Sequence, residues 1–181
     1  MANWFRKIFG KSSDTLRVTT DTSPNGVYSG LRHQALSIRR ADFSIPDPPP
    51  EAPIWGVLME TGYSGATATL FALLDGTTSL YISSGGGIIG GHGHENVREA
   101  NAAFIRTANQ FYRHLKACES FPVPALGQTI FYVITDSGIL TGEGLDDDLG
   151  NGRHLLSPLF HAGHAVLTPL IQTTENAGQD A

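Results

Sequence analysis

The chain has 181 residues, of which 40% are hydrophobic and 16% are charged. This composition is typical of a folded domain and excludes an intrinsically disordered chain, and the length allows a core that forms without disulfides or a structural metal. The formal net charge of −5 at pH 7 argues against a nucleic-acid-binding protein, because a phosphate backbone requires a surface of clustered lysine and arginine.

The single cysteine, Cys118, cannot form a disulfide within the chain, so the sequence indicates a reducing compartment and a cytoplasmic protein. Glu119 follows it directly, and a neighbouring carboxylate disfavours the thiolate that a cysteine nucleophile needs. No apolar run approaches the roughly 20 residues that cross a membrane. Arg6 and Lys7 interrupt the N-terminal stretch, which therefore does not resemble a signal peptide.

Residues 1–11 are predicted to form a short amphipathic segment. On a helical turn its apolar side chains share one face and its basic residues lie elsewhere, which is the pattern of a helix at a membrane surface. A helix this short is marginally stable by itself, so a frayed terminus, or one that docks on its own domain, is the favoured interpretation. The apolar residues are Trp4, Phe5, Ile8 and Phe9.

Residues 12–53 are predicted to form a linker that leads into the domain. Residues 12–30 are rich in serine, threonine, aspartate, proline and glycine, which is typical of a loop. In residues 31–43, apolar positions recur at four- and three-residue spacing, so an additional N-terminal helix is predicted there. The prolines between residues 45 and 53 require an extended spacer.

A single domain is predicted over residues 54–172. Its first half reads as three strands, and the Asp75-Gly76 pair between the last two is a strong hairpin signal. An amphipathic helix over residues 95–117 follows, with Asn96 and Glu99 in the positions of a capping box. The three strands are residues 54–60, 66–74 and 77–83.

The second half of the domain is predicted to hold another hairpin and a last helix. The strands are residues 128–135 and 139–143, and an acidic loop follows at 145–152. Ser157 suits the position before a helix that begins at Pro158, and Pro169 is expected to end or kink that helix. Residues 173–181 then form a polar tail.

These elements predict an α+β fold. The order βββ-α-ββ-α, with the possible extra N-terminal helix, favours an antiparallel β-sheet with helices packed on one face. The physical reason is that the apolar face of the sheet and the apolar stripe of each helix must be buried against each other.

The most unusual composition is the glycine-dense crossover between the third strand and the long helix. Several backbone N–H groups there could bind an anion or a small ligand beside the helix start. However, the lysine of a P-loop and the parallel setting of a dinucleotide fingerprint are both missing. The favoured interpretation is that the glycines allow tight turns and close backbone approach. The candidate ligand-binding residues are Ser83, Ser84, Gly85, Gly86, Gly87, His92 and His94.

Four histidines are candidate metal ligands. His92 and His94 lie beside the start of the long helix, and His161 and His164 lie three residues apart in the last helix. Imidazole suits zinc and other transition metals. None of the spacings is a recognised metal-binding motif, so histidines that are hydrogen-bonded or solvated are the favoured interpretation, and no cofactor is expected.

The segment WGVLMETGYSGATATLFALLDGTTSLYISSGGGIIGG, together with SPLFHAGHAVLTPLI, resembles a family of uncharacterised bacterial proteins with no assigned activity. The likeness covers most of residues 54–172 and implies no catalytic residues. At the level of fold alone, the predicted order is similar to that of the small acidic type III secretion chaperone-like proteins, which bind partner polypeptides as dimers. A Roadblock or longin-type domain fits less well, because its first long helix usually follows two strands instead of three.

Two hypotheses from different classes follow. The first is a non-enzymatic protein-interaction or chaperone-like module, dimeric, that uses a sheet face or edge for a protein partner. The alternative is a small-ligand or anion-binding domain centred on the crossover at residues 83–94. An enzyme that uses the four histidines with a metal is the least favoured reading.

Overall fold

The computed structural model describes residues 23–43 and 45–177. The predicted amphipathic segment 1–11, with Trp4, Phe5, Ile8 and Phe9, lies outside the described residues. None of the described helices is long and apolar enough to cross a membrane.

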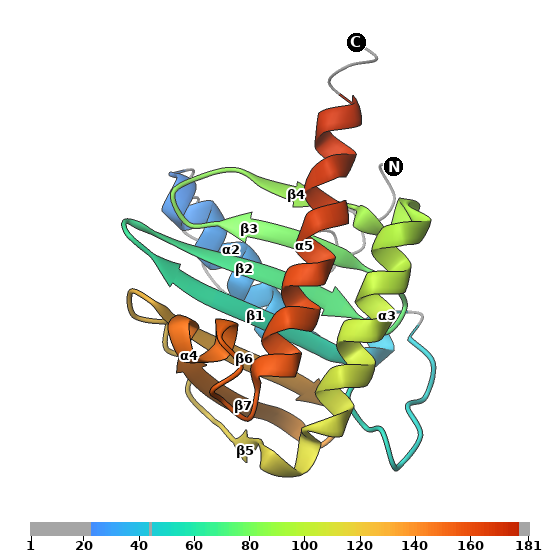
Figure 1. Ribbon diagram of the computed structural model, residues 1–181. Helices are drawn as coiled ribbons and strands as arrows, with labels where there is room; N and C mark the ends of the chain where they lie inside the picture. Colours follow the sequence, from blue (N-terminus) through green and yellow to red (C-terminus); the bar gives the residue numbers. More distant parts are fainter. Residues whose placement is uncertain (1–22, 44, 178–181) are drawn as a thin grey trace, which may run out of the picture.

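In the described part of the chain, a seven-stranded sheet has the strand order β4-β3-β2-β1-β6-β7-β5 (Figure 1). Neighbouring strands are antiparallel throughout. The predicted α+β class and antiparallel sheet are therefore confirmed. The strands are β1 (Gly56–Tyr63), β2 (Ala66–Leu73), β3 (Thr78–Ile82), β4 (Gly87–Ile89), β5 (Lys116–Ala117), β6 (Gln128–Thr135) and β7 (Gly138–Leu145).

The glycine-dense crossover forms a tight turn and a short edge strand, β4, which the sequence analysis did not predict. Gly85 and Gly86 make the turn with φ of 117° and 84°, a region that residues with a side chain rarely adopt. At Gly87 an added Cβ would lie 2.4 Å from the carbonyl oxygen of Leu80. The glycines therefore serve backbone conformation and close approach of the two strands.

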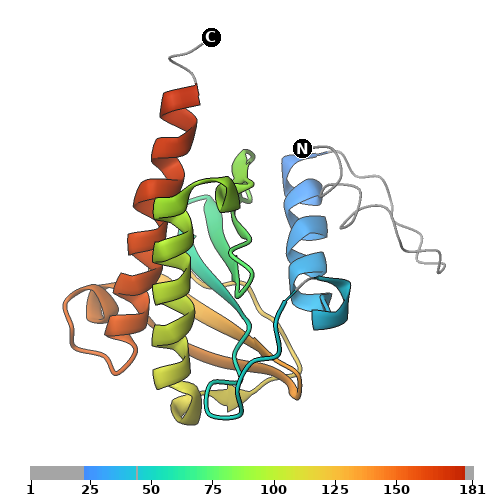
Figure 2. The ribbon, with the colours of Figure 1, turned by 90° about the vertical axis from the view of Figure 1, so that its right-hand side faces the viewer.

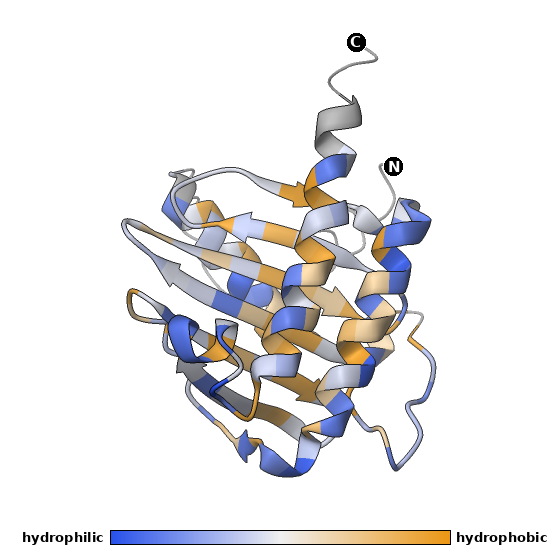
Figure 3. Ribbon diagram, viewed as in Figure 1, coloured by the Kyte–Doolittle hydropathy of each residue, from blue (hydrophilic) through white to orange (hydrophobic). Residues whose placement is uncertain are grey.

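Two long helices, α3 (Glu95–Gln110) and α5 (Ser157–Ala177), cover one face of the sheet. They run side by side across the strands (Figure 1), and hydrophobic residues recur along both of them (Figure 3). Val57 and Met59 of β1 point to this face and belong to the larger core cluster with Phe104 of α3 and Leu159 of α5. The predicted packing of these helices on one face is observed.

The opposite face is covered by the N-terminal helix α2 (Pro24–Ser37) (Figure 2). The side chains that alternate with the larger cluster, such as Leu58 of β1 and Tyr132 of β6, form a second core cluster with Tyr28 and Ala35 of α2. Phe121, in the loop between β5 and β6, packs against the same cluster. The sheet therefore lies between two layers, and helix α2 and that loop share one side.

Helix α2 begins earlier than predicted. Ser23 precedes it, and the Ser23 hydroxyl accepts a hydrogen bond from the N–H of Gly26. Pro24 occupies the first helical position, where a proline loses no intrahelical hydrogen bond. The predicted loop over residues 12–30 is thus wrong from Pro24 onward, because serine and proline together act here as a helix start.

Helix α3 is shorter than the predicted 95–117 and ends at Gln110. The side-chain amide of Asn109 bonds to both the N–H and the carbonyl of Ile54, which fixes the helix end at the start of β1. The chain then turns through a 3-10 helix at Tyr112–His114 into β5. His94, not Asn96, precedes the first helical residue.

Helix α5 continues through Pro169 to Ala177, although the proline was expected to end or kink it. The buried residues Val166 and Leu170 on either side of the proline belong to the larger core cluster, and this packing favours continuation of the helix. The tail predicted from residue 173 is therefore helical as far as Ala177. The acidic loop predicted at 145–152 contains a short helix, α4 (Asp146–Gly150).

Candidate functional site

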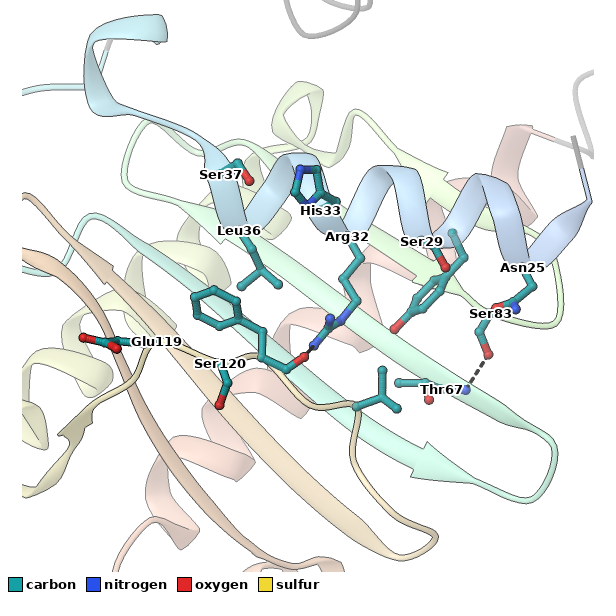
Figure 4. Close-up of a pocket in the computed structure, with 13 residues that line it drawn as sticks. Asn25, Ser29, Arg32, His33, Leu36, Ser37, Thr67, Ser83, Glu119 and Ser120 are labelled. Carbon is teal, nitrogen blue, oxygen red and sulfur yellow. Dashed lines mark hydrogen bonds between the residues drawn. The ribbon is translucent and has the colours of Figure 1, made fainter. Parts of the chain in front are cut away.

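A groove of about 500 Å³ lies between α2 and the loop at residues 119–123. Figure 4 shows side chains of α2 on one side of this groove and side chains of the loop and of β2 on the other. Its lining combines polar and apolar groups. The lining residues are Asn25, Tyr28, Ser29, Arg32, His33, Leu36, Ser37, Thr67, Ser83, Glu119, Ser120, Phe121 and Val123.

The groove is built around an ion pair between Glu60 of β1 and Arg32 of α2. The side chain of Glu60 is 0% exposed and that of Arg32 is 13% exposed. Arg32 Nε donates to Glu60 Oε1 at 2.7 Å, and Nη2 donates to Oε2 at 2.7 Å. Burial alone would lower the pKa of Arg32, but the hydrogen bonds and charge of Glu60 raise it. Because a buried carboxylate is costly without a partner, this bidentate pair fixes Arg32 in place.

A chain of hydroxyl groups joins the same carboxylate to the first half of α2. Thr69 Oγ1 donates to Glu60 Oε1 at 3.0 Å. This donation uses the only hydroxyl proton of Thr69, so in the 2.8 Å contact between Thr69 and Tyr28 the Tyr28 hydroxyl is the donor. Burial, and then the charge of Glu60, raises the pKa of Tyr28. The buried carboxylate thus holds α2 at two successive turns.

Arg32 also fixes the far wall of the groove. Its Nη2 donates to the carbonyl oxygens of Phe121 and Pro122 at 3.0 and 3.2 Å. The Tyr132 hydroxyl donates to the same Pro122 oxygen at 2.5 Å, and burial, followed by the charge of Glu60, raises the pKa of Tyr132 to about 12. The guanidinium carbon lies 5.7 Å from the centre of the Tyr132 ring, within the range of a cation–π contact.

Residues 125–127, which follow the loop at 119–123, lie against the end of β1. Gly127 N–H donates to the carbonyl of Gly62 at 2.8 Å. A Cβ on Gly62 would lie 2.1 Å from the carbonyl oxygen of Ala125, so only glycine allows this approach. Both walls of the groove are therefore anchored before any molecule binds.

One donor of Arg32 remains for a bound molecule. Within the described residues, Nε and Nη2 make the hydrogen bonds of Arg32 and Nη1 makes none. Half-buried Leu36 and Phe121 and the 55% exposed Val123 supply apolar surface around it. The arrangement can bind an oxygen acceptor that is flanked by apolar groups.

The predicted ligand-binding residues of the crossover are brought together only in part. Ser83 lies at the groove, where its hydroxyl accepts from the N–H of Thr67 at 2.8 Å (Figure 4). The others do not line the groove. Ser84, Gly85 and Gly86 lie in the turn, Gly87 lies in β4, and His92 and His94 lie beyond β4, just before α3.

The four candidate metal-binding histidines lie in two separate places. His92 and His94 flank Gly93 just before α3. The neighbouring Gly91 lies against Leu170 of α5. His164 precedes Leu170 by about 9 Å along α5, at 1.5 Å per residue, and His161 lies further back. Among residues 23–43 and 45–177, no three His, Cys, Asp or Glu side chains gather in a group that could hold a metal ion.

His164 lies in an apolar environment instead. The centre of its ring is 4.3 Å from that of Phe160, and its Nε2 is buried without a hydrogen-bond partner in the described structure. Burial lowers the pKa of His164. His164 is therefore a half-buried histidine at the edge of the core.

The sequence analysis did not identify Arg32 and Glu60. The available signal was Glu60 itself, a charged residue in an apolar strand. It alternates with Val57 and Met59, so its side chain faces the other side of the sheet. Its partner lies 28 residues away in sequence, and the loop that Arg32 also binds lies 89 residues from Arg32. Pairing over such separations follows from packing and not from local pattern.

Comparison of the chain with models of protein families, with curated proteins and with solved structures returns no match.

Proposed function

We propose that this chain is a protein-interaction module of the chaperone-like kind, which holds an extended segment of a partner polypeptide in the groove between α2 and the loop at residues 119–123. The observation that supports this most directly is the position of Arg32, whose Nη1 remains free within the described residues, in a groove with apolar walls. An extended polypeptide offers both complementary groups, a carbonyl or carboxylate oxygen and apolar side chains.

The rigidity of the groove favours binding. The guanidinium of Arg32 is already held by Glu60 and by two loop carbonyls, so little side-chain entropy is lost when Nη1 donates a hydrogen bond to a ligand oxygen. A hydrogen bond from a charged donor contributes about 1.5–3 kcal/mol. The volume of about 500 Å³ accommodates a few residues of a partner, not a folded domain.

The groove, and not an open sheet face, is the proposed place of binding, because helices cover the two faces of the sheet (Figure 2). We assign the module no catalytic step and place it in the cytoplasm. The half-buried Cys118 thiol, whose pKa is raised by burial, supports both assignments, since a raised pKa disfavours the reactive thiolate and a lone thiol persists in a reducing compartment.

The test is selection from a random peptide library against the purified full chain, followed by fluorescence anisotropy with the enriched peptides. Two variants obstruct the groove at exposed positions, Ser29→Trp and Val123→Glu. Val27→Glu is the matched control, because Val27 is 51% exposed on the same helix and does not line the groove. Circular dichroism melting confirms that each variant is folded.

We expect enriched peptides with a carboxylate next to apolar residues, and at least a tenfold loss of affinity in both groove variants with no loss in the control. Failure to enrich any peptide, or equal binding by all three variants, refutes the proposal. If no peptide binds, but a small anionic compound raises the melting temperature of the unsubstituted chain and not that of Ser29→Trp, the small-ligand alternative replaces the proposal.

A further inference from the structure

The two ends of the groove differ in chemistry. Figure 4 shows Asn25 and Ser83 toward the end where α2 begins, and Ser37 and Glu119 toward the end where α2 finishes. Arg32 lies between the two ends (Figure 4). The first end carries amide and hydroxyl groups, whereas the second end carries a carboxylate. A ligand that lies along the groove therefore meets a different polar group at each end.

Glu119 presents its carboxylate from a backbone that is held on both sides. The Cys118 N–H donates to the carbonyl of Ile139 at 3.0 Å, and the carbonyl of Phe121 accepts from Arg32 at 3.0 Å. The Glu119 side chain itself is exposed, and none of the ion pairs between the described residues includes it. Its carboxylate is therefore positioned to pair with a group outside the chain.

The charges of the groove favour a ligand that brings a cation. Arg32 and Glu119 are the arginine and the glutamate of the lining. Glu60 neutralises Arg32 in a pair at 2.7 Å, so Arg32 offers a directed donor, Nη1, but little net positive charge. An anion would gain the hydrogen bond from Nη1 and be repelled by Glu119. A ligand with both an acceptor and a cation complements both groups.

The spacing of the two groups corresponds to two residues of an extended polypeptide. Glu119 precedes Phe121, the residue that Arg32 contacts, by two positions, which span at most about 7 Å of backbone. On α2, the distance from Arg32 to Ser37 is about 7.5 Å at 1.5 Å per residue. Alternate side chains of an extended segment point to the same side, so residues i and i+2 of a ligand can reach Arg32 and Glu119.

The ligand residue between these two meets apolar surface. Its side chain points away from its neighbours, toward the wall that α2 forms, where the half-buried Leu36 lies between Arg32 and Ser37 (Figure 4). Phe121 packs edge-on against Tyr132, with the ring centres 5.5 Å apart, so this part of the groove is held in shape. Burying an apolar side chain there is favourable.

We propose that the groove selects a partner segment in which an acidic and a basic residue flank one apolar residue, with the carboxylate on Arg32 Nη1 and the cation on Glu119. This partner class rests on the proposed function, since it concerns the same groove. Arg32 holds the acidic residue, and Glu119 determines the charge that is accepted two positions away. Glu119 is thus a specificity-determining residue.

The peptide library selection on the full chain, analysed position by position, tests this specificity. We expect lysine or arginine to be enriched two positions from aspartate or glutamate, with an apolar residue between them. Selection on Glu119→Lys should replace the basic residue with an acidic one at that position. Glu99→Lys is the matched control, because it changes the net charge equally at an exposed position of α3, on the other face of the sheet, and it should keep the basic preference.

Anisotropy titrations of one peptide pair give the magnitude. A peptide with lysine at the selected position should bind Glu119→Lys about three- to tenfold more weakly than the unsubstituted chain, as expected for an exposed ion pair that becomes a repulsion. The same peptide with glutamate in place of that lysine should bind Glu119→Lys more tightly than it binds the unsubstituted chain. Both differences should shrink at high salt, which screens exposed charges.

The outcomes separate this inference from the proposed function. Peptides that bind the groove without a charge preference at that position overturn the inference and leave the proposed function standing. So does a preference that Glu119→Lys leaves unchanged, or one that Glu99→Lys alters equally. Failure to enrich any peptide overturns both.

Discussion

The buried pair between Arg32 and Glu60 gives the sharpest prediction for stability. Arg32→Met leaves the fully buried Glu60 carboxylate without its cation, and breaking a buried pair in this way costs about 3–5 kcal/mol. The double substitution Arg32→Met with Glu60→Leu removes the unpaired charge and replaces it with apolar volume. The hydrogen bonds from Arg32 to the loop carbonyls are lost in both variants, and the double variant also loses the bond from Thr69 to Glu60, at about 1 kcal/mol.

The assay is equilibrium urea unfolding, followed by circular dichroism and compared at equal m-values. We expect the double variant to recover roughly 2–4 kcal/mol relative to Arg32→Met, which is the cost of the unpaired carboxylate less the lost bond from Thr69. Arg39→Met is the control, because Arg39 is 82% exposed and its contact with Asp42 is a 3.5 Å surface pair, so its change should stay below about 1 kcal/mol. The reasoning is refuted if Arg32→Met costs less than 1 kcal/mol, or if adding Glu60→Leu destabilises the chain further.

Two further predictions concern the crossover and the last helix. Gly91→Ala should lower the free energy of unfolding in urea by about 1–3 kcal/mol, because its Cβ would lie 2.6 Å from Leu170. Gly93→Ala is the control, because no atom lies within 4 Å of its Cβ. Equal effects of the two substitutions would show that Gly91 is not closely packed. Burial lowers the pKa of His164 in the folded state, so its contribution to stability is complete above the unfolded pKa near 6.5 and is lost as pH falls below that value toward the folded pKa. His164→Met should therefore reduce the loss of unfolding free energy between about pH 7.5 and about pH 5.5, by at most about 1.4 kcal/mol per pH unit; an unchanged pH profile would contradict this.

Local patterns predicted those elements whose signals lie within a few residues. The Asp75-Gly76 pair identified the β2–β3 hairpin, apolar spacing identified α3, and Ser157-Pro158 identified the start of α5. The limits of the elements were less predictable where tertiary contacts set them: Asn109 ends α3 by binding the backbone of Ile54, and packing on both sides of Pro169 carries α5 past it.

The groove could not be predicted from these patterns. It depends on Glu60, Arg32 and Phe121, which come from a strand, a helix and a loop far apart in sequence. The histidines show the converse, because four residues that look related in the sequence lie in two separate places on the molecule. Residue type indicated possible chemistry, and only the fold decided which side chains meet.

By itself, the sequence determined the α+β class, the antiparallel hairpins and the amphipathic helices, because turn chemistry and hydrophobic period act over a few residues. The tertiary structure alone decided that α2 covers the second face of the sheet, that β4 is an edge strand of the sheet as described, and that a buried carboxylate orients Arg32. Each of these depends on burial shared between distant segments, and the free energy of burial is set by what surrounds a side chain in space.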